Sequence, residues 1–122
     1  MRIDRFSKSR NVRFLNVLDL NDIFALCSQN TLYYQYCPPF VNRDLILEEM
    51  RTFPEKTSRD DKYYCGFFDN GELIAIIDLI DHYPTDKSVF IGFFMMDVKK
   101  QRHGTGTEII TELCKYLREE KI

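Results

Sequence analysis

The chain has 122 residues, of which 44% are hydrophobic and 30% are charged, and its formal net charge is −2 at pH 7. This length and composition are typical of one globular domain, so residues 1–122 are predicted to form a single domain. The small net charge argues against a nucleic-acid partner, which would need a broad basic surface. The sequence shows no apolar run of membrane-spanning length and no signal peptide at residues 1–10. We therefore expect a cytoplasmic protein without a membrane partner.

The cysteines and histidines are too far apart in the sequence to suggest a metal site. They are Cys27, Cys37, Cys65, Cys114, His82 and His103. A zinc site needs such ligands at short spacings, often as a C-x-x-C pair. We therefore expect no bound metal, and we interpret the cysteines as buried or half-buried thiols.

The first part of the chain predicts a strand followed by two helices. Residues 12–18 alternate apolar and polar side chains with the period of a strand. Apolar residues recur at helical spacing within 20–27 and again within 43–53. Between these two helices, residues 33–40 include Pro38-Pro39, which cannot continue a helix. We expect this segment to interrupt the helical pattern.

The second part of the chain predicts three strands and a final helix. Strand-like runs at residues 62–68 and 73–80 flank Asn70-Gly71, a strong signal for a tight hairpin. Residues 88–96 are apolar at both parities, which predicts a central strand covered on both faces. Apolar residues then recur every four positions from 109 to 117, as in a helix that packs on a sheet. This order predicts a layered α/β domain with a largely antiparallel sheet.

A glycine turn joins the last predicted strand to the last predicted helix, with the sequence Gln-Arg-His-Gly-Thr-Gly at residues 101–106. A helix N-terminus offers unpaired amides, and glycines remove the Cβ atoms that would keep a phosphate away. The turn is neither a Walker motif nor a dinucleotide fingerprint. It favours a pyrophosphate site, with a tight turn that binds nothing as the alternative. The expected amide donors are Arg102, His103, Gly104, Gly106 and Thr107.

The sequence around this turn, FFMMDVKKQRHGTG, resembles the acetyl-CoA-binding signature of the GNAT (Gcn5-related) N-acetyltransferase superfamily. Gln101, Gly104 and Gly106 fill the three defining positions of the pattern [Q/R]-x-x-G-x-[G/A]. The predicted order of elements is similar to the first seven elements of that fold. The stretches at residues 33–39, 69–84 and 91–97 also resemble a bacterial group of small GNAT proteins. By this resemblance the cosubstrate is acetyl-CoA, the acceptor is a primary amine of a small molecule or peptide, and no metal takes part.

The resemblance also implies roles for individual residues. The backbone groups of Phe94 and Met96 would bind the pantetheine arm, and the Phe94 amide would donate a hydrogen bond to the thioester oxyanion. Ordinary core packing is the alternative for their side chains. The implied cofactor-binding residues are Phe94, Met96, Gln101, Arg102, His103, Gly104, Thr105, Gly106 and Thr107.

The resemblance does not fix the general base or the acceptor pocket. Where histone-type family members carry a carboxylate, this chain has Phe90. The candidates for the base are Asp97, Asp78, Asp81 and His103, and each carboxylate has an alternative interpretation as a solvated strand end. The candidates for the acceptor pocket are Tyr33, Tyr34 and Tyr36, which otherwise would pack their loop against the sheet.

The resemblance stops with the last predicted helix, whereas a full family member continues into a strand, a helix and two further strands. We therefore expect a truncated domain that keeps the acetyl-CoA-binding half and is weak or inactive alone. A second copy of the chain or a partner is expected to cover the open strand at residues 88–96. The alternatives are a non-catalytic CoA-binding or interaction module completed by a partner chain, and a degenerate fragment without function.

Overall fold

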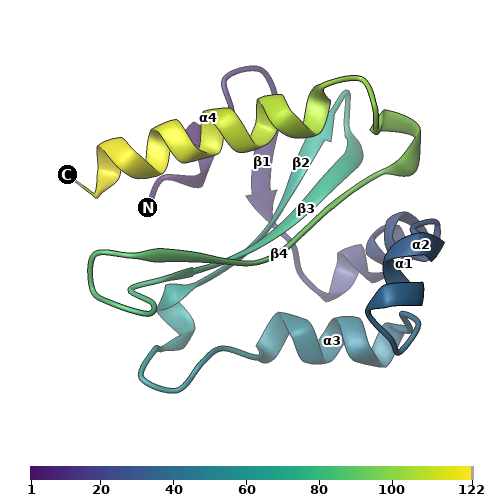
Figure 1. Ribbon diagram of the computed structural model, residues 1–122, viewed down its shortest axis with the longest axis horizontal. Helices are drawn as coiled ribbons and strands as arrows, with labels where there is room; N and C mark the ends of the chain where they lie inside the picture. Colours follow the sequence, from purple (N-terminus) through teal and green to yellow (C-terminus); the bar gives the residue numbers. More distant parts are fainter. Residues whose placement is uncertain (122) are drawn as a thin grey trace.

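The computed structural model describes residues 1–121 and confirms the predicted α/β fold (Figure 1). The described strands form one sheet in the order β1-β2-β3-β4, and every neighbouring pair is antiparallel. The strands are β1 (Asn11–Phe14), β2 (Lys62–Asp69), β3 (Glu72–Asp81) and β4 (Val89–Met96). The helices are α1 (Leu20–Ser28), α2 (Thr31–Tyr36), α3 (Arg43–Arg51) and α4 (Thr105–Glu120). Within residues 1–121, no helix has both the length and the apolar character needed to cross a membrane.

Two hydrophobic cores lie on opposite faces of the sheet. The long helix α4 covers one face, and α1, α2 and α3 lie on the other side (Figure 1). The core beneath α4 includes Phe67, Ile77, Ile109 and Leu113. The core beneath α1 and α3 includes Ile23, Ile46, Tyr64 and Ile76. Because β2 and β3 are covered on both faces, their sequences read as nearly continuous apolar runs.

The first strand is shorter than its sequence predicts. The prediction covered residues 12–18, but β1 ends at Phe14 and a 3-10 turn follows over Val17–Asp19. Asn16 and Asp19 form a capping box, in which the Asp19 carboxylate accepts a hydrogen bond from the Asn16 amide at 2.9 Å. This local cap competes with strand pairing and ends the strand early.

The predicted interruption between the first helices contains a short helix, α2, which the sequence did not indicate. The break begins at Cys37, where α2 ends, rather than at residue 33. A helix of this length is not stable alone, so tertiary contacts must supply its stability. The ring of Tyr33 packs edge-on against Phe93 of β4, with the ring centroids 5.9 Å apart. This contact joins segments that are remote in the sequence.

The predicted hairpin is confirmed, and so are the helices predicted over residues 20–27 and 43–53. Asn70 and Gly71 connect β2 to β3 with φ angles of 50° and 79°, as a tight hairpin turn requires. The helix predicted over residues 43–53 is α3, which ends at Arg51. Asn42 caps its start by accepting a hydrogen bond from a backbone amide of the first turn.

The strand predicted over residues 88–96 is present as β4, but it lies at an edge of the described sheet and not in its centre. Phe90 and Ile91 are 46% and 38% exposed, whereas Met95 and Met96 near the other end are buried. The prediction of a strand covered on both faces is therefore wrong for its first half. Apolar residues at both parities do not distinguish a central strand from an edge strand with an exposed apolar face.

The cysteines agree with the prediction at three positions and differ at one. Cys27 and Cys65 are buried, Cys114 is half-buried, and Cys37 is exposed. Burial raises the pKa of the Cys27 thiol to about 11 and that of Cys65 to about 12, so both are inert thiols at neutral pH. Cys37 is exposed because it follows the end of α2 at the turn into Pro38.

Candidate functional site

The glycine turn leaves the first amides of α4 free of backbone partners. Gly104 precedes Thr105, the first helical residue, with a φ of 77°, a left-handed conformation that favours glycine. A Cβ atom built on Gly104 would meet no heavy atom within 4 Å. The Glu108 amide donates to the Gly104 carbonyl at 3.0 Å. The amides of Thr105, Gly106 and Thr107 precede this bond, so they have no partner within the helix.

Gln101 ties the glycine turn to β4 and to the end of α1. Its Nε2 donates to Asn30 Oδ1 at 2.9 Å and to the Met96 carbonyl at 3.3 Å. Asn30 Nδ2 in turn donates to the Met96 carbonyl at 3.1 Å and to the Leu26 carbonyl at 3.0 Å. The side-chain amide of Gln101 and the backbone carbonyl of Met96 are therefore already hydrogen-bonded within the protein. Sequence reasoning missed Asn30, because no local signal marks a contact across 71 positions.

The other predicted residues of the turn surround its open side. Arg102 and His103 are exposed, and Arg102 has a positive φ of 67°. Gly106 lies over Met96, whose Cγ would be 3.6 Å from a Cβ at that position. The structure thus brings the predicted residues from 101 to 107 into one turn, with a cationic side chain at its rim.

A bulge in β4 lies next to the predicted oxyanion donor. The pairing of β3 with β4 shifts register between Asp78 and Leu79, and Gly92 is the extra residue. Phe94 follows this bulge, opposite Ile77, and its side chain packs on the core beneath α4. A bulge bends its strand and redirects the backbone groups around it, which is a common feature beside active sites.

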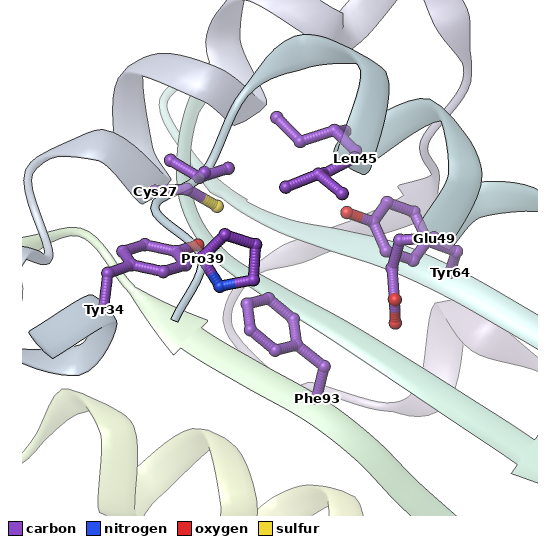
Figure 2. Close-up of a pocket in the computed structure, with 9 residues that line it drawn as sticks. Cys27, Tyr34, Pro39, Leu45, Glu49, Tyr64 and Phe93 are labelled. Atoms are coloured by element: carbon purple, nitrogen blue, oxygen red, sulfur yellow. The ribbon is translucent and has the colours of Figure 1, made fainter. Parts of the chain in front are cut away.

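An apolar pocket of about 140 Å³ opens on the other face of the sheet, beneath α1 and α3 (Figure 2). Its walls come from helices, from a loop and from two strands of the sheet. They include Cys27, Val41, Ile46, Tyr64 and Phe93. Glu49 also lines the pocket and is the acidic residue among those that line it (Figure 2). An apolar pocket with few polar groups is the usual form of a small-molecule site.

The three tyrosines predicted for the acceptor pocket have different positions. Tyr34 lines the pocket (Figure 2). Tyr33 packs against Tyr34 with the ring centroids 4.9 Å apart, so it supports the pocket from outside. Tyr36 is 80% exposed and does not reach it. Tyr64 of β2 lines the pocket but was not predicted, because its place in an apolar run resembles that of a core residue.

Asp78 is a buried carboxylate beside this pocket. It is 3% exposed, and its Oδ2 accepts a hydrogen bond from Lys62 Nζ at 2.8 Å. Its Oδ1 is buried without a partner among the described residues. Burial, followed by the neighbouring Glu49, raises the pKa of Asp78 to about 7, although Lys62 acts in the opposite direction. A carboxyl with this pKa can exchange a proton near neutral pH.

The other predicted bases lie away from the pocket. Asp97 is buried, and its Oδ1 accepts a hydrogen bond from the Lys99 amide at 2.9 Å, which caps a short 3-10 turn. Asp81 pairs with Lys121 at the far end of β3. His103 is exposed in the glycine turn. Among the predicted candidates for the base, Asp78 is the one whose surroundings include pocket residues.

The family comparison agrees with this arrangement of turn, strand and pocket. The model of the Acetyltransferase (GNAT) family matches residues 28–122, which is more than half of the chain. The chain belongs to the GNAT acetyltransferase family. No curated protein matches this GNAT chain.

Solved structures share the GNAT fold at low sequence identity. An acetyltransferase from Thermus thermophilus has a TM-score of 0.71 and 11% identity, over 88% of this chain and 69% of its own. The ribosomal-protein-S18-alanine N-acetyltransferase from Escherichia coli has a TM-score of 0.61 and 13% identity, over 91% and 61%. PaiA N-acetyltransferase from Thermoplasma acidophilum, in complex with coenzyme A, has a TM-score of 0.61 and 16% identity, over 94% and 76%. The chain thus spans less than two thirds of the Escherichia coli protein.

The glycine turn of the GNAT chain has the features of an anion site. The open space at Gly104 is where any larger side chain would project, and the backbone there has a conformation that larger residues rarely adopt. The free amides of α4 and its partial positive charge suit an anion. The residues present are therefore compatible with the family's use of acetyl-CoA.

Proposed function

We propose that the chain binds acetyl-CoA at the glycine turn and transfers the acetyl group to a primary amine bound in the apolar pocket. The observation that carries this proposal is the N-terminus of α4, where Gly104 leaves open space over three free amides. The family match supports the choice of cosubstrate. The bulge at Gly92 supports the place of reaction, since it directly precedes Phe93, which lines the pocket, and Phe94, the proposed oxyanion donor.

In the proposed reaction, Asp78 accepts a proton from the ammonium group of the acceptor. The neutral nitrogen then attacks the thioester carbonyl carbon, and the Phe94 amide stabilises the oxyanion of the tetrahedral intermediate. When the C–S bond breaks, the nitrogen loses a second proton and the departing thiolate takes up a proton. Asp78 suits the first step because its pKa of about 7 lies close to the working pH.

The test of the cosubstrate is a comparison of two glycine variants. Gly104→Glu places a carboxylate in the turn, so we expect it to weaken acetyl-CoA binding by about tenfold or more through bulk and like charge. Isothermal titration calorimetry with acetyl-CoA measures this effect. Gly71→Glu is a matched control, because Gly71 has a similar φ of 79° and equally open surroundings. It carries the same backbone strain and the same added charge on the β2–β3 hairpin, outside the turn.

The two variants separate loss of the site from loss of the fold. Equal affinity of Gly104→Glu and wild type for acetyl-CoA would refute the proposed site, and so would an equal loss in Gly71→Glu. Release of free coenzyme A in the presence of amines then tests the reaction. Binding of acetyl-CoA without turnover of any amine would support a non-catalytic CoA-binding module instead.

A further inference from the structure

We infer that the acceptor is a small monoamine with one apolar group about the size of a benzene ring, and that Glu49 binds its ammonium group. This inference rests on the proposed function and names the substrate class of the same site. It also assigns a specificity role to Glu49, a residue that the sequence did not single out.

The size of the pocket limits the apolar part of the acceptor. The pocket measures about 140 Å³, close to the roughly 150 Å³ of an apolar cavity that is known to bind benzene. A single aryl or branched alkyl group fills such a volume. A long polyamine or a peptide would leave most of its length outside the pocket.

The lining of the pocket excludes strongly polar groups from the apolar end of the acceptor. Val41 and Ile46 are buried aliphatic residues of the wall, and Phe93 and Tyr64 supply aromatic surfaces. A polar group placed against such a wall would lose its hydrogen bonds to water without replacement. An apolar group gains from burial there.

The charges at the pocket favour a cation and disfavour an anion. Glu49 is the charged residue among those that line the pocket (Figure 2). The nearby cation, Lys62, is held by Asp78 at 2.8 Å. No lysine, arginine or histidine is among the nine residues that line the pocket. An acceptor with a carboxylate next to its amine would therefore meet Glu49 without a compensating cation.

The position of Glu49 places the amine beside the proposed base. Glu49 lies close enough to Asp78 to be the largest contribution after burial to the raised pKa of that carboxyl. The unpartnered Oδ1 of Asp78 needs a hydrogen-bond donor. An ammonium group has three donors, so it can bond to Glu49 and still offer a proton toward Asp78.

A binding panel tests the acceptor class without requiring turnover. The amines are 2-phenylethylamine, isopentylamine, L-phenylalanine and spermidine, titrated into the wild-type chain and followed by NMR chemical shifts. We expect 2-phenylethylamine and isopentylamine to bind about tenfold or more tightly than L-phenylalanine and spermidine. Equal or tighter binding of L-phenylalanine or spermidine would overturn the inference.

Two glutamates of α3 provide a matched pair of variants. Glu49→Gln is expected to weaken 2-phenylethylamine binding by about tenfold, through loss of the charge that faces the ammonium. Glu48→Gln makes the same change at an exposed neighbouring position outside the pocket lining and should bind like wild type. Unchanged affinity in Glu49→Gln, or the same loss in both variants, would exclude the role of Glu49.

The same protein samples, titrated with acetyl-CoA, separate this inference from the proposed function. Glu49→Gln should retain wild-type affinity for acetyl-CoA, because Glu49 lies on α3 and is not a residue of the glycine turn or of the hydrogen bonds of Gln101. Amine binding without acetyl-CoA binding would leave the pocket assignment standing and remove the proposed reaction. Acetyl-CoA binding without the expected amine binding would leave the cosubstrate assignment standing and remove the inferred acceptor class.

Discussion

Asp78 is held between groups that act on its charge in opposite directions. Lys62 donates a hydrogen bond to one oxygen at 2.8 Å, whereas burial and Glu49 disfavour the ionised form. The net effect is a pKa raised from the ordinary value of 3.8 to about 7. Such a group changes charge in the range where acetyl transfer would operate, which distinguishes it from an ordinary surface carboxylate.

Asp78→Asn should lower the rate of acetyl transfer and change its pH dependence. In the wild type, we expect the rate to rise as the pH passes through about 7, because Asp78 must be ionised to accept a proton. The variant should lose this inflection and about two orders of magnitude of rate. Steady-state rates from about pH 5.5 to about pH 9 measure both effects, since this range spans the raised pKa. An unchanged inflection would assign the proton transfer to another group.

The same carboxyl should make stability depend on pH. Because the pKa of Asp78 is higher in the folded state than in the unfolded state, its stabilising contribution is complete below about pH 4. That contribution falls between about pH 4 and about pH 7, by on the order of 4 kcal/mol, since one pKa unit corresponds to about 1.4 kcal/mol. We expect the free energy of unfolding of Asp78→Asn, measured with urea at a series of pH values, to change less with pH over this range than that of the wild type. The test compares the pH dependence and not the absolute stability, because the variant also leaves Lys62 unpaired at every pH.

At the level of elements, α4 joins the core to the glycine turn. Ile109 and Leu113 are fully buried against the sheet, and they hold the helix whose first amides form the proposed anion site. Leu113→Ala should lower the free energy of unfolding by about 3 kcal/mol, through lost burial and the cavity left behind. Thr111→Ala, on the exposed side, should change it by less than about 0.5 kcal/mol. Urea unfolding at fixed pH would contradict this assignment if the two variants lost equal stability.

The elements that could be predicted are those with a strong local signal. The hairpin at Asn70-Gly71, the periodic pattern of α4 and the glycines of the turn each follow from neighbouring residues. The short helix α2 could not be predicted, because its stability comes from contacts such as that of Tyr33 with Phe93. Asn30 escaped notice for the same reason.

The candidate site shows the same division between local and long-range information. The residues of the glycine turn are neighbours in the sequence, so the turn could be predicted from its own letters. The pocket combines side chains from helices, a loop and two strands, so its members share no spacing in the sequence. Glu49 reads as one more exposed charge on α3, and Tyr64 as one more apolar residue of β2. Only packing shows that they face one another.

On the scale of the whole molecule, β4 presents an exposed apolar edge. Phe90 and Ile91 are both more than one third exposed, and an edge strand of this kind pairs readily with another chain. We expect the chain to self-associate through β4. Ile91→Lys should raise the dissociation constant of the dimer by about tenfold, since a charge on an edge strand opposes pairing. Sedimentation velocity over a concentration series measures this change.

Leu18→Lys is the matched control for that experiment. Leu18 is 90% exposed and lies outside the sheet, after the end of β1. The Leu18→Lys substitution adds the same charge to an apolar residue of the same size without changing β4. A wild-type chain that stays monomeric at high concentration would contradict the expected association, and so would equal weakening by the two variants.

The two cores on opposite faces of the sheet separate two kinds of evolutionary change. The helix α4, which begins at the glycine turn, packs on one core, and the apolar pocket is lined by residues of the core beneath α1 and α3. A lineage can therefore remodel the pocket, one wall residue at a time, while the packing that supports the turn is conserved. Under the proposed function, such a scaffold would keep acetyl-CoA as its donor while changes in the pocket residues exchange one amine acceptor for another.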